Sequence, residues 1–297
     1  INSLGNRVDG GIILIAGVAI ISYLVVLQWN QDYGTQAIAP QKVTSVSAYD
    51  VDTIITDFSV ATQPSNNSDI IVAQAKNTAP GSLIEVSTDT IKVVIDTQGG
   101  DIIQASLIDY LAEIEHSDVP FTLLEQNQQR TYVAQSGLIG VNGTDLRSRP
   151  IFKATQPIYQ LQEGQQSLEV VLSLTDDTGA LINKIYTFSR GSHLVNLTYA
   201  VDNRGTQPWS ANLFGQLKRD RSADPTAAGG MGMSAYLGAA FSFPDEKYYR
   251  YDFDDMDDKN LKRTELGGWV GMLQHYFVTA WVPNPELRNG YSTRVNN

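Results

Sequence analysis

The sequence predicts a mainly β protein, a β-sandwich, with one membrane-spanning helix near its amino-terminal end. Beyond residue 82, apolar and polar residues alternate with a period of two, which is typical of strands with one buried face. Earlier in the chain, residues 10–31 include no charged side chain and form a run long enough to cross a bilayer. The length of 297 residues and the 42% hydrophobic composition suffice for one large domain with an appendage.

The apolar run favours a retained membrane anchor over a cleaved signal peptide. A helix rises about 1.5 Å per residue, so roughly 20 residues cross a hydrocarbon core of about 30 Å. Trp29 and Tyr33 follow the run, where interfacial aromatic residues are expected. The competing interpretation places a cleavage site at residues 37–39, but the run exceeds the roughly 7 to 15 apolar residues of a signal peptide. Arg7 before the run and Asp32 after it favour a cytoplasmic amino terminus.

A polar linker separates this anchor from the β-rich part of the chain. Its composition is rich in Gln, Asn, Ser, Thr and Ala, and cannot bury enough apolar area to offset the entropy lost on ordering. Within this linker, only residues 53–60 have a composition that could form a local strand. We therefore predict an amino-terminal region over 1–31 with its helix at about 10–31, a flexible tether over 32–81 and a β domain over 82–297.

The strands of the β domain are predicted from alternation and from turn signals. Ile91, Val93 and Ile95 alternate with polar residues, and a turn follows at residues 98–101. Two other alternating runs cover residues 168–174 and 195–201. Between these runs, a hairpin signal at 176–179 precedes a strand through Phe188. After them, a turn at 203–205 leads to a strand through Trp209, Ala211 and Leu213. Several such strands joined by short turns indicate a sandwich.

One stretch gives conflicting signals. Trp269, Met272, Tyr276 and Ala280 fall at helical spacing, which by itself predicts an amphipathic helix. The aromatic content and the closing Pro283 favour strands. We predict a strand, a short helical turn and a second strand.

Composition excludes several classes of function. The formal charge of −11 and the pI near 4.7 argue against binding to nucleic acid, which requires clustered Lys and Arg. The sequence has no cysteine, which rules out disulfides, thiolate chemistry and cysteine-based metal sites.

The residue pattern points to no catalytic, cofactor-binding or metal site, and we predict that the chain is not an enzyme. The three histidines, His116, His193 and His275, belong to no recognised catalytic motif. Isolated histidines are usually structural or exposed. The alternative is an acid–base pair of His193 or His275 with Glu246 or Glu265, which in principle opens a sugar ring.

Three further segments receive structural interpretations. The acidic run 251–258 would place Met256 and Asp257 where a calcium-binding EF-hand loop needs a ligand and a glycine, so a solvated loop is favoured over a metal site. The glycine-rich residues 229–233 are interpreted as a flexible connection. Residues 218–221, with Lys218 and Arg219, are interpreted as a strand end, with contact to anionic lipid headgroups as the minor alternative.

An ordered set of sequence blocks resembles the YidC membrane-protein insertases of gammaproteobacteria. The anchor ends in residues 27–33 (LQWNQDY), like the first transmembrane segment of that family. The later blocks follow in the order that the family uses: 97–101, 120–125, 134–138, 214–218, 238–242, 244–248, 267–270, 274–277 and 279–283. Together they span most of residues 10–285. Each block alone is weakly specific, but the ordered set is specific.

The resemblance implies a β-supersandwich, similar in shape to galactose mutarotases, held by its helix in the inner membrane with the domain in the periplasm. It implies a role in inserting and folding inner-membrane proteins, alone or with the Sec translocon and its SecD and SecF subunits. It also implies that the family's chains continue past Asn297 with the remaining strands and five membrane helices, whose groove receives nascent transmembrane segments. The β domain within 82–297 is then incomplete, and the groove residues lie outside this chain.

Two other hypotheses remain open beside this one. The mutarotase-like shape suggests a periplasmic carbohydrate-binding or epimerising module, in which Trp209, Tyr248, Tyr249 and Trp281 stack on sugar faces. A third hypothesis is a purely structural anchor and spacer. The favoured one is an accessory insertase domain that offers a cleft or an edge strand to a partner without a cofactor.

Overall fold

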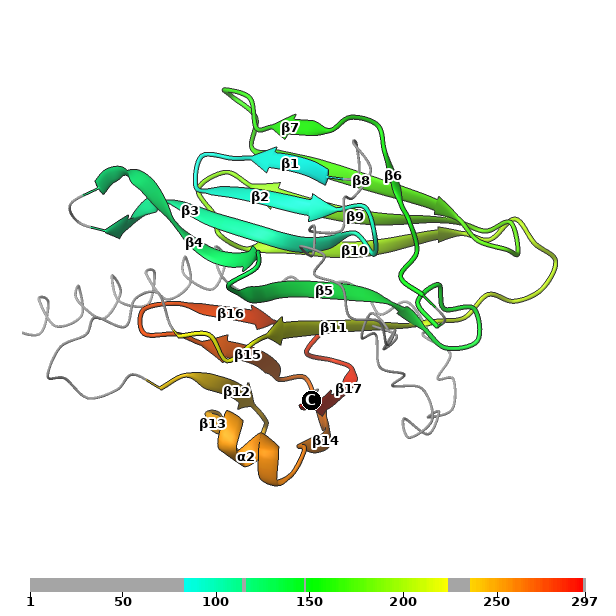
Figure 1. The fold of residues 1–297 in the computed structure, drawn as a ribbon. Coiled ribbons are helices and arrows are strands. Elements are labelled where there is room, and N and C mark those ends of the chain that lie inside the picture. Colours follow the sequence, from blue (N-terminus) through cyan, green and yellow to red (C-terminus); the bar gives the residue numbers. More distant parts are fainter. Residues whose placement is uncertain (1–82, 114–115, 147, 224–235, 296–297) are drawn as a thin grey trace, which may run out of the picture. The chain divides into compact units, whose positions relative to one another are not determined.

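The computed structural model describes residues 83–113, 116–146, 148–223 and 236–295 (Figure 1). Every described residue belongs to one unit of the chain, Asp50–Asn297. The predicted membrane helix, tether, local strand at 53–60 and connection at 229–233 lie outside the described residues. Within the described part of the chain, no helix has the length and apolar character needed to cross a membrane.

The first sheet is the largest, and in it the described strands run in the order β11-β5-β4-β3-β2-β1-β7. The pairs are antiparallel except β1 with β7, where Glu85 lies beside Ile158 in a parallel register. Its strands are β1 (Leu83–Ser87), β2 (Ile91–Asp96), β3 (Asp101–Glu113), β4 (His116–Gln126), β5 (Thr131–Ile139), β7 (Ile158–Gln160) and β11 (Asn212–Arg219).

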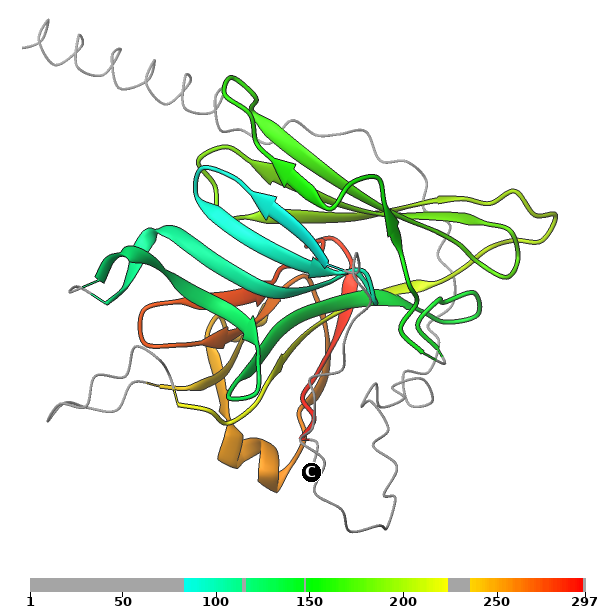
Figure 2. The same ribbon diagram turned by 45° about the horizontal axis from the view of Figure 1, so that its top comes forward.

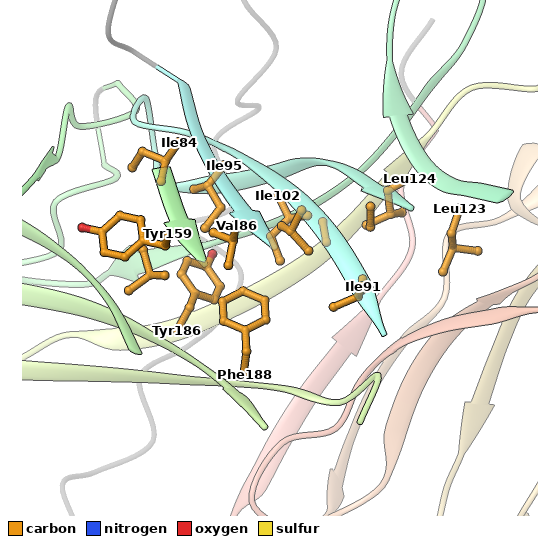
Figure 3. Close-up of a cluster of buried hydrophobic side chains, with 14 of the residues drawn as sticks. Ile84, Val86, Ile91, Ile95, Ile102, Leu123, Leu124, Tyr159, Tyr186 and Phe188 are labelled. Carbon is orange, nitrogen blue, oxygen red and sulfur yellow. The ribbon is translucent and has the colours of Figure 1, made fainter. Parts of the chain in front are cut away.

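A second sheet packs on one face of the first and completes a sandwich. It has the order β10-β9-β8-β6 and consists of β6 (Lys153–Ala154), β8 (Ser167–Thr175), β9 (Leu181–Ser189) and β10 (Val195–Asp202). Figure 3 shows Ile84 and Ile95 of the first sheet on one side of this core, with Tyr186 and Phe188 of β9 on the other. Burial of each such side chain stabilises the fold by about 1.5–3 kcal/mol, so the alternation determines which faces meet.

A third layer has its own core. Its sheet has the order β13-β12-β15-β16, and a ribbon of β14 and β17 accompanies it. Phe241, Phe243, Met256 and Tyr291 are buried together there. The elements are β12 (Gly238–Ser242), β13 (Tyr249–Asp252), α2 (Phe253–Asp258), β14 (Lys262–Leu266), β15 (Trp269–Leu273), β16 (Val278–Trp281) and β17 (Arg288–Ser292).

The first and third sheets meet along β11 and β16, as both views show (Figure 2). The Trp281 indole nitrogen donates a hydrogen bond of 3.1 Å to the Gln216 carbonyl oxygen. Gly215 makes room for the ring, because a Cβ there would lie 2.8 Å from Trp281 Cδ2. The indole therefore acts as a core and junction group.

The predicted mainly β sandwich is confirmed, and so are the alternating strands that became β2, β8, β9 and β10. The strand end at residues 218–221 is also confirmed, since β11 ends at Arg219. The stretch around Tyr276 forms the two predicted strands. Its short helical turn is wrong, because residues 274–277 make a bend in which the Gln274 amide donates to the Phe277 carbonyl over 2.8 Å.

Two other local predictions are wrong for reasons visible in the contacts. Trp209 and Ala211 precede β11 in a loop, because the Trp209 indole nitrogen bonds to Asp176 Oδ2 at 2.8 Å instead of following a ladder. The acidic run is not a loop but the end of β13 followed by α2. Asp252 and Asp255 form a reciprocal capping box at its start, and Met256 anchors it in the core.

Candidate functional site

The densest group of charged side chains in the described part of the chain is buried between the first two sheets, beneath the turn from β2 to β3. Asp101 begins β3 and Lys184 lies in the middle of β9. Asp145 and Arg149 come from the segment between β5 and β6. Asp101, Asp145 and Lys184 are all buried, with Lys184 fully inaccessible to solvent. We call these four residues the buried ionic cluster.

The cluster balances two carboxylates with two cations. Arg149 pairs with both Asp101 and Asp145. Lys184 Nζ donates to the carbonyl oxygens of Gly99 at 2.8 Å and Ser136 at 3.0 Å, and lies 3.9 Å from Asp101 Oδ1. A buried charge is tolerated only when it is paired and hydrogen-bonded, and this pairing ties β9 of the second sheet to β3 and β5 of the first.

Neutral groups donate further hydrogen bonds to the carboxylates of the cluster and to the backbone beside it. Gln135 Nε2 donates to Asp101 Oδ2 at 2.8 Å, and the Leu138 amide donates to Asp145 Oδ2 at 2.9 Å. The Tyr186 hydroxyl donates to the Gly100 carbonyl oxygen at 2.6 Å. Backbone and side chains thus enclose the cluster and bond to most of its polar atoms, and Arg149 Nε is the member that has no hydrogen-bond partner among the described residues.

Burial dominates the protonation behaviour of the cluster. Desolvation lowers the pKa of Lys184 to about 7, although Asp101 opposes the shift. Desolvation also raises the pKa of Asp145, against the opposing effect of Arg149. Burial raises the pKa of Tyr186 well above its ordinary value. Because these groups face each other and not solvent, the arrangement holds two sheets together and offers no surface for a substrate.

Two surface pockets contain residues of the sugar-binding hypothesis, but they are separate. The first has a volume of about 420 Å³ and contains Glu246, Tyr248 and Tyr249 together with residues of β13 and α2. Burial raises the pKa of Tyr236 in this pocket to about 12, and the Tyr236 hydroxyl donates to the Ala239 carbonyl oxygen at 2.7 Å. Asp252 and Asp255, its other carboxylates, cap α2.

The second pocket, of about 410 Å³, is lined by Trp209 and polar residues of the loop after β10. Its polar groups maintain the loop itself: Asn203 Nδ2 donates to the Gln207 carbonyl oxygen at 2.9 Å, and the Trp209 indole bonds to Asp176. Trp281 lies at the β11–β16 junction instead. The four aromatic residues proposed for sugar stacking therefore form no single platform.

The structure gives His193 and His275 aromatic neighbours in place of the predicted acid–base partners. His193 lies against Tyr110, with ring centroids 5.9 Å apart, and His275 stacks on Tyr276 at 4.1 Å. Glu265 pairs with Arg263 at 2.7 Å. His116 lies in β4, where its backbone is opposite that of Glu113. Within the described ranges, no three His, Asp or Glu residues are grouped so as to hold a metal ion.

One aromatic cluster escaped the sequence reasoning. Phe121 of β4 stacks on Phe277 at 4.4 Å, and Tyr110 of β3 meets Phe277 edge-on at 5.4 Å. His193 completes the group through Tyr110. The cluster connects the β3–β4 hairpin, the loop before β10 and the β15–β16 turn. Its only sequence signal was a pair of aromatic residues at 276–277 inside a run without charged side chains.

Comparison with known proteins decides the family. The model for the YidC periplasmic domain matches residues 83–297. The chain belongs to the YidC family. Similar relatives are the membrane protein insertases YidC of Azotobacter vinelandii, 45% identical over 290 residues, and of Pseudomonas fluorescens strain SBW25, 43% identical over 292 residues. These alignments cover 95% of this chain and 52% and 51% of the relatives, so the chain spans about half their length.

The YidC match confirms the family that the ordered blocks predicted. It also agrees with the β-rich sandwich, because the matched range begins at β1 and includes all described strands. The relatives are named as insertases, which describes transport and not a chemical conversion.

Proposed function

We propose that this chain is the membrane-anchored, periplasmic part of a membrane protein insertase that inserts and folds inner-membrane proteins, alone or with the Sec translocon. The observation that carries the proposal is the match of residues 83–297 to the YidC periplasmic domain. Relatives at 41–45% identity that are named insertases support it.

The proposed arrangement has three regions. Residues 1–31 hold a helix at about 10–31 in the inner membrane with the amino terminus in the cytoplasm, residues 32–81 form the tether, and residues 82–297 form the periplasmic domain. The uncharged run and the polar, proline-containing linker support the first two regions.

We propose that this domain acts by display and not by catalysis. Its ionic cluster is enclosed, and the polar groups described in both pockets make internal bonds. A rigid sandwich on a tether instead presents surfaces to partners, namely SecD, SecF and other translocon components. Nascent membrane proteins would engage the membrane helices that the resemblance assigns beyond this chain, and the lipid bilayer holds the anchor.

The test is co-purification from membranes. The full-length parent protein and a version without residues 82–297 are tagged and expressed at equal levels, and the SecD and SecF recovered with each are quantified. We expect the deletion to lose most of both partners while remaining in the membrane. Unchanged recovery would show that this domain is not the partner-binding element.

A further inference from the structure

The second sheet of the sandwich ends in a long strand with an open edge. β10 pairs with β9 along its whole length, from Val195 opposite Phe188 to Asp202 opposite Leu181, without a bulge. It is the last strand of that sheet (Figure 1), and no described residue pairs with its other side. Backbone hydrogen bonds outside the ladders of the described strands include none from residues 195–202. The free side of β10 is therefore a row of unpaired backbone groups in the described part of the chain.

The bonds at the two ends of the β8–β9 ladder show which backbone groups of β10 face this open edge. The Arg190 amide donates to the Gln166 carbonyl oxygen, and the Asp176 amide donates to the Ala180 carbonyl oxygen. In register with these bonds, the even-numbered residues of β9 bond to β8, so its odd-numbered residues bond to β10. Their partners in β10 are the even-numbered residues. The N–H and C=O groups of the odd-numbered residues within 195–201 therefore point to the open edge.

The same odd-numbered residues carry the apolar face of β10. Val195, Leu197 and Tyr199 pack against the core of the sandwich but are only partly buried. Val201 is 36% exposed, and Thr198 is exposed on the opposite face of the strand. A strand that is added at the open edge and has an apolar side chain at every second position would therefore extend the core.

β10 lacks the features by which proteins usually protect a sheet edge. Charged side chains, prolines, bulges and short strands are the common protective features. Residues 195–201 contain no Lys, Arg, Asp, Glu, Pro or Gly. By comparison, the end strands β6, β7, β13 and β16 have two to four residues each, the ribbon strands β14 and β17 have five, and β11 contacts β16. Among the described strands, β10 is thus the longest end strand without a neighbour on its free side.

The sequence of β10 is complementary to itself in antiparallel pairing. When a second copy pairs so that Thr198 lies opposite Thr198, the outward-facing residues are opposed as Val195 with Val201 and Leu197 with Tyr199. Each opposed outward-facing pair exchanges two backbone bonds, so the four pairs across the edge form roughly eight. Every apolar side chain on the inner face then has an apolar side chain opposite it.

We propose that β10 binds β10 of a second copy of this chain, so that the second sheets of two protomers form one antiparallel sheet across a two-fold axis. The axis passes between the two Thr198 residues, and the same surface of each protomer forms the contact. Asp202, the one charged residue of β10, lies at the end of the strand, so the two carboxylates remain at opposite ends of the pair. This self-association goes beyond the proposed insertase role and does not depend on it.

The absence of cysteine from the chain allows pairing and register to be tested together. The full 297-residue chain with Thr198→Cys or with Asn196→Cys is reconstituted in phosphatidylcholine vesicles and mildly oxidised, and disulfide-linked dimer is quantified on non-reducing gels. Thr198→Cys should form dimer, because residues opposed in a non-hydrogen-bonded pair have Cα atoms about 4.5 Å apart, within the range of a disulfide. Asn196→Cys is the matched exposed control. Its two copies are offset by four residues, about 13 Å along the strand, so it should form at least tenfold less dimer.

A mixture of Asn196→Cys and Ala200→Cys chains should restore the cross-link, because these two residues lie opposite each other in the proposed register. Adding Thr198→Lys to both chains opposes two like charges at the axis. This change should reduce the cross-link at least fivefold and leave the far-ultraviolet circular dichroism spectrum unchanged, since the side chain is exposed. Equal cross-linking of the single Thr198→Cys and Asn196→Cys chains would overturn the proposal, and so would a lysine variant that cross-links as well as its parent mixture.

Hydrogen exchange distinguishes a second copy from other occupants of the edge. In the proposed dimer, the outward-facing amides of Leu197 and Tyr199 should exchange more slowly as the number of chains per vesicle rises. Protection of these amides at every dilution, without a cross-link, would assign the edge to a segment of the same chain. Cross-linking of Thr198→Cys to a different protein in native membranes, without dimer, would assign the edge to that protein. Either result would contradict self-association through β10.

Discussion

Gly100 illustrates how one residue decides whether the turn above the buried ionic cluster can form. Its φ of +63° lies in the left-handed region, and a Cβ would lie 2.9 Å from Leu172 Cδ1 and 3.0 Å from Lys184 Cδ. Glycine at this position therefore meets both a conformational and a packing requirement.

Gly100→Ala should lower the free energy of unfolding by about 3 kcal/mol, since left-handed strain and overpacking each contribute roughly 1–2 kcal/mol. Gly179→Ala is the matched control, because its φ is +85° but nothing lies within 4 Å of the added Cβ. That change should cost only about 1 kcal/mol. Urea unfolding measures both, and equal losses would show that packing at Gly100 is unimportant.

Lys184 should make stability depend on pH in a definite direction. Its folded pKa of about 7 is below the ordinary 10.5, so between these values the unfolded chain binds more protons. The free energy of unfolding then rises with pH across this window.

Lys184→Met should lower the free energy of unfolding by roughly 3 kcal/mol near pH 7, because it leaves the buried carbonyl oxygens of Gly99 and Ser136 without their donor. The variant should also lack the increase of the free energy of unfolding with pH. The difference in the free energy of unfolding between wild type and variant should therefore widen between about pH 7 and pH 9. Unfolding curves across this range test the prediction, with the exposed Lys153→Met as control. A constant difference would mean that Lys184 does not titrate in the window.

At the scale of elements, the Phe121–Phe277 pair joins the β3–β4 hairpin to the β15–β16 turn. Stacked aromatic pairs contribute about 0.5–1.5 kcal/mol beyond their area. A double-mutant cycle of Phe121→Leu and Phe277→Leu should therefore give a coupling of about 1 kcal/mol in unfolding experiments. Phe121 with Phe241, which belong to different cores, should be additive within about 0.5 kcal/mol. Additivity in both cycles would show that the hairpin and the turn are energetically independent.

Local sequence patterns predicted those strands whose position depends only on residues close in the sequence. In β8 and β9, alternating apolar residues and the turn between them contain all the information needed. The failures came where one contact outside the pattern prevailed. The Trp209 indole bond to Asp176 holds the chain before β11 in a loop, and burial of Met256 together with the Asp252 cap makes a helix of an acidic run. The aromatic cluster was beyond reach because its members lie up to 167 residues apart, between Tyr110 and Phe277.

At the scale of the whole molecule, the predicted membrane helix determines whether the chain stays bound to the membrane. The full chain should stay in the membrane pellet after alkaline carbonate extraction, because burial of roughly 20 apolar residues in the bilayer outweighs release. A variant lacking residues 10–31 should appear in the supernatant. Immunoblotting and mass spectrometry of both fractions measure this. A soluble product shortened at residues 37–39 would instead support the signal-peptide interpretation.

The family, the mainly β class and the buried faces of the regular strands could be predicted from the amino-acid sequence, since ordered blocks and alternation are properties of neighbouring residues. Only the tertiary structure shows which charges meet in the core and which aromatic side chains form the cluster of Tyr110, Phe121, His193 and Phe277. Those groupings depend on strand order and sheet stacking, which bring Lys184 to Gly99 and Phe277 to Phe121 across long separations. The hydrophobic effect is non-directional, so it favours burial of any apolar face and does not select the partner of a given side chain. The partners of a charged or aromatic side chain are fixed only when the strands and sheets have assembled.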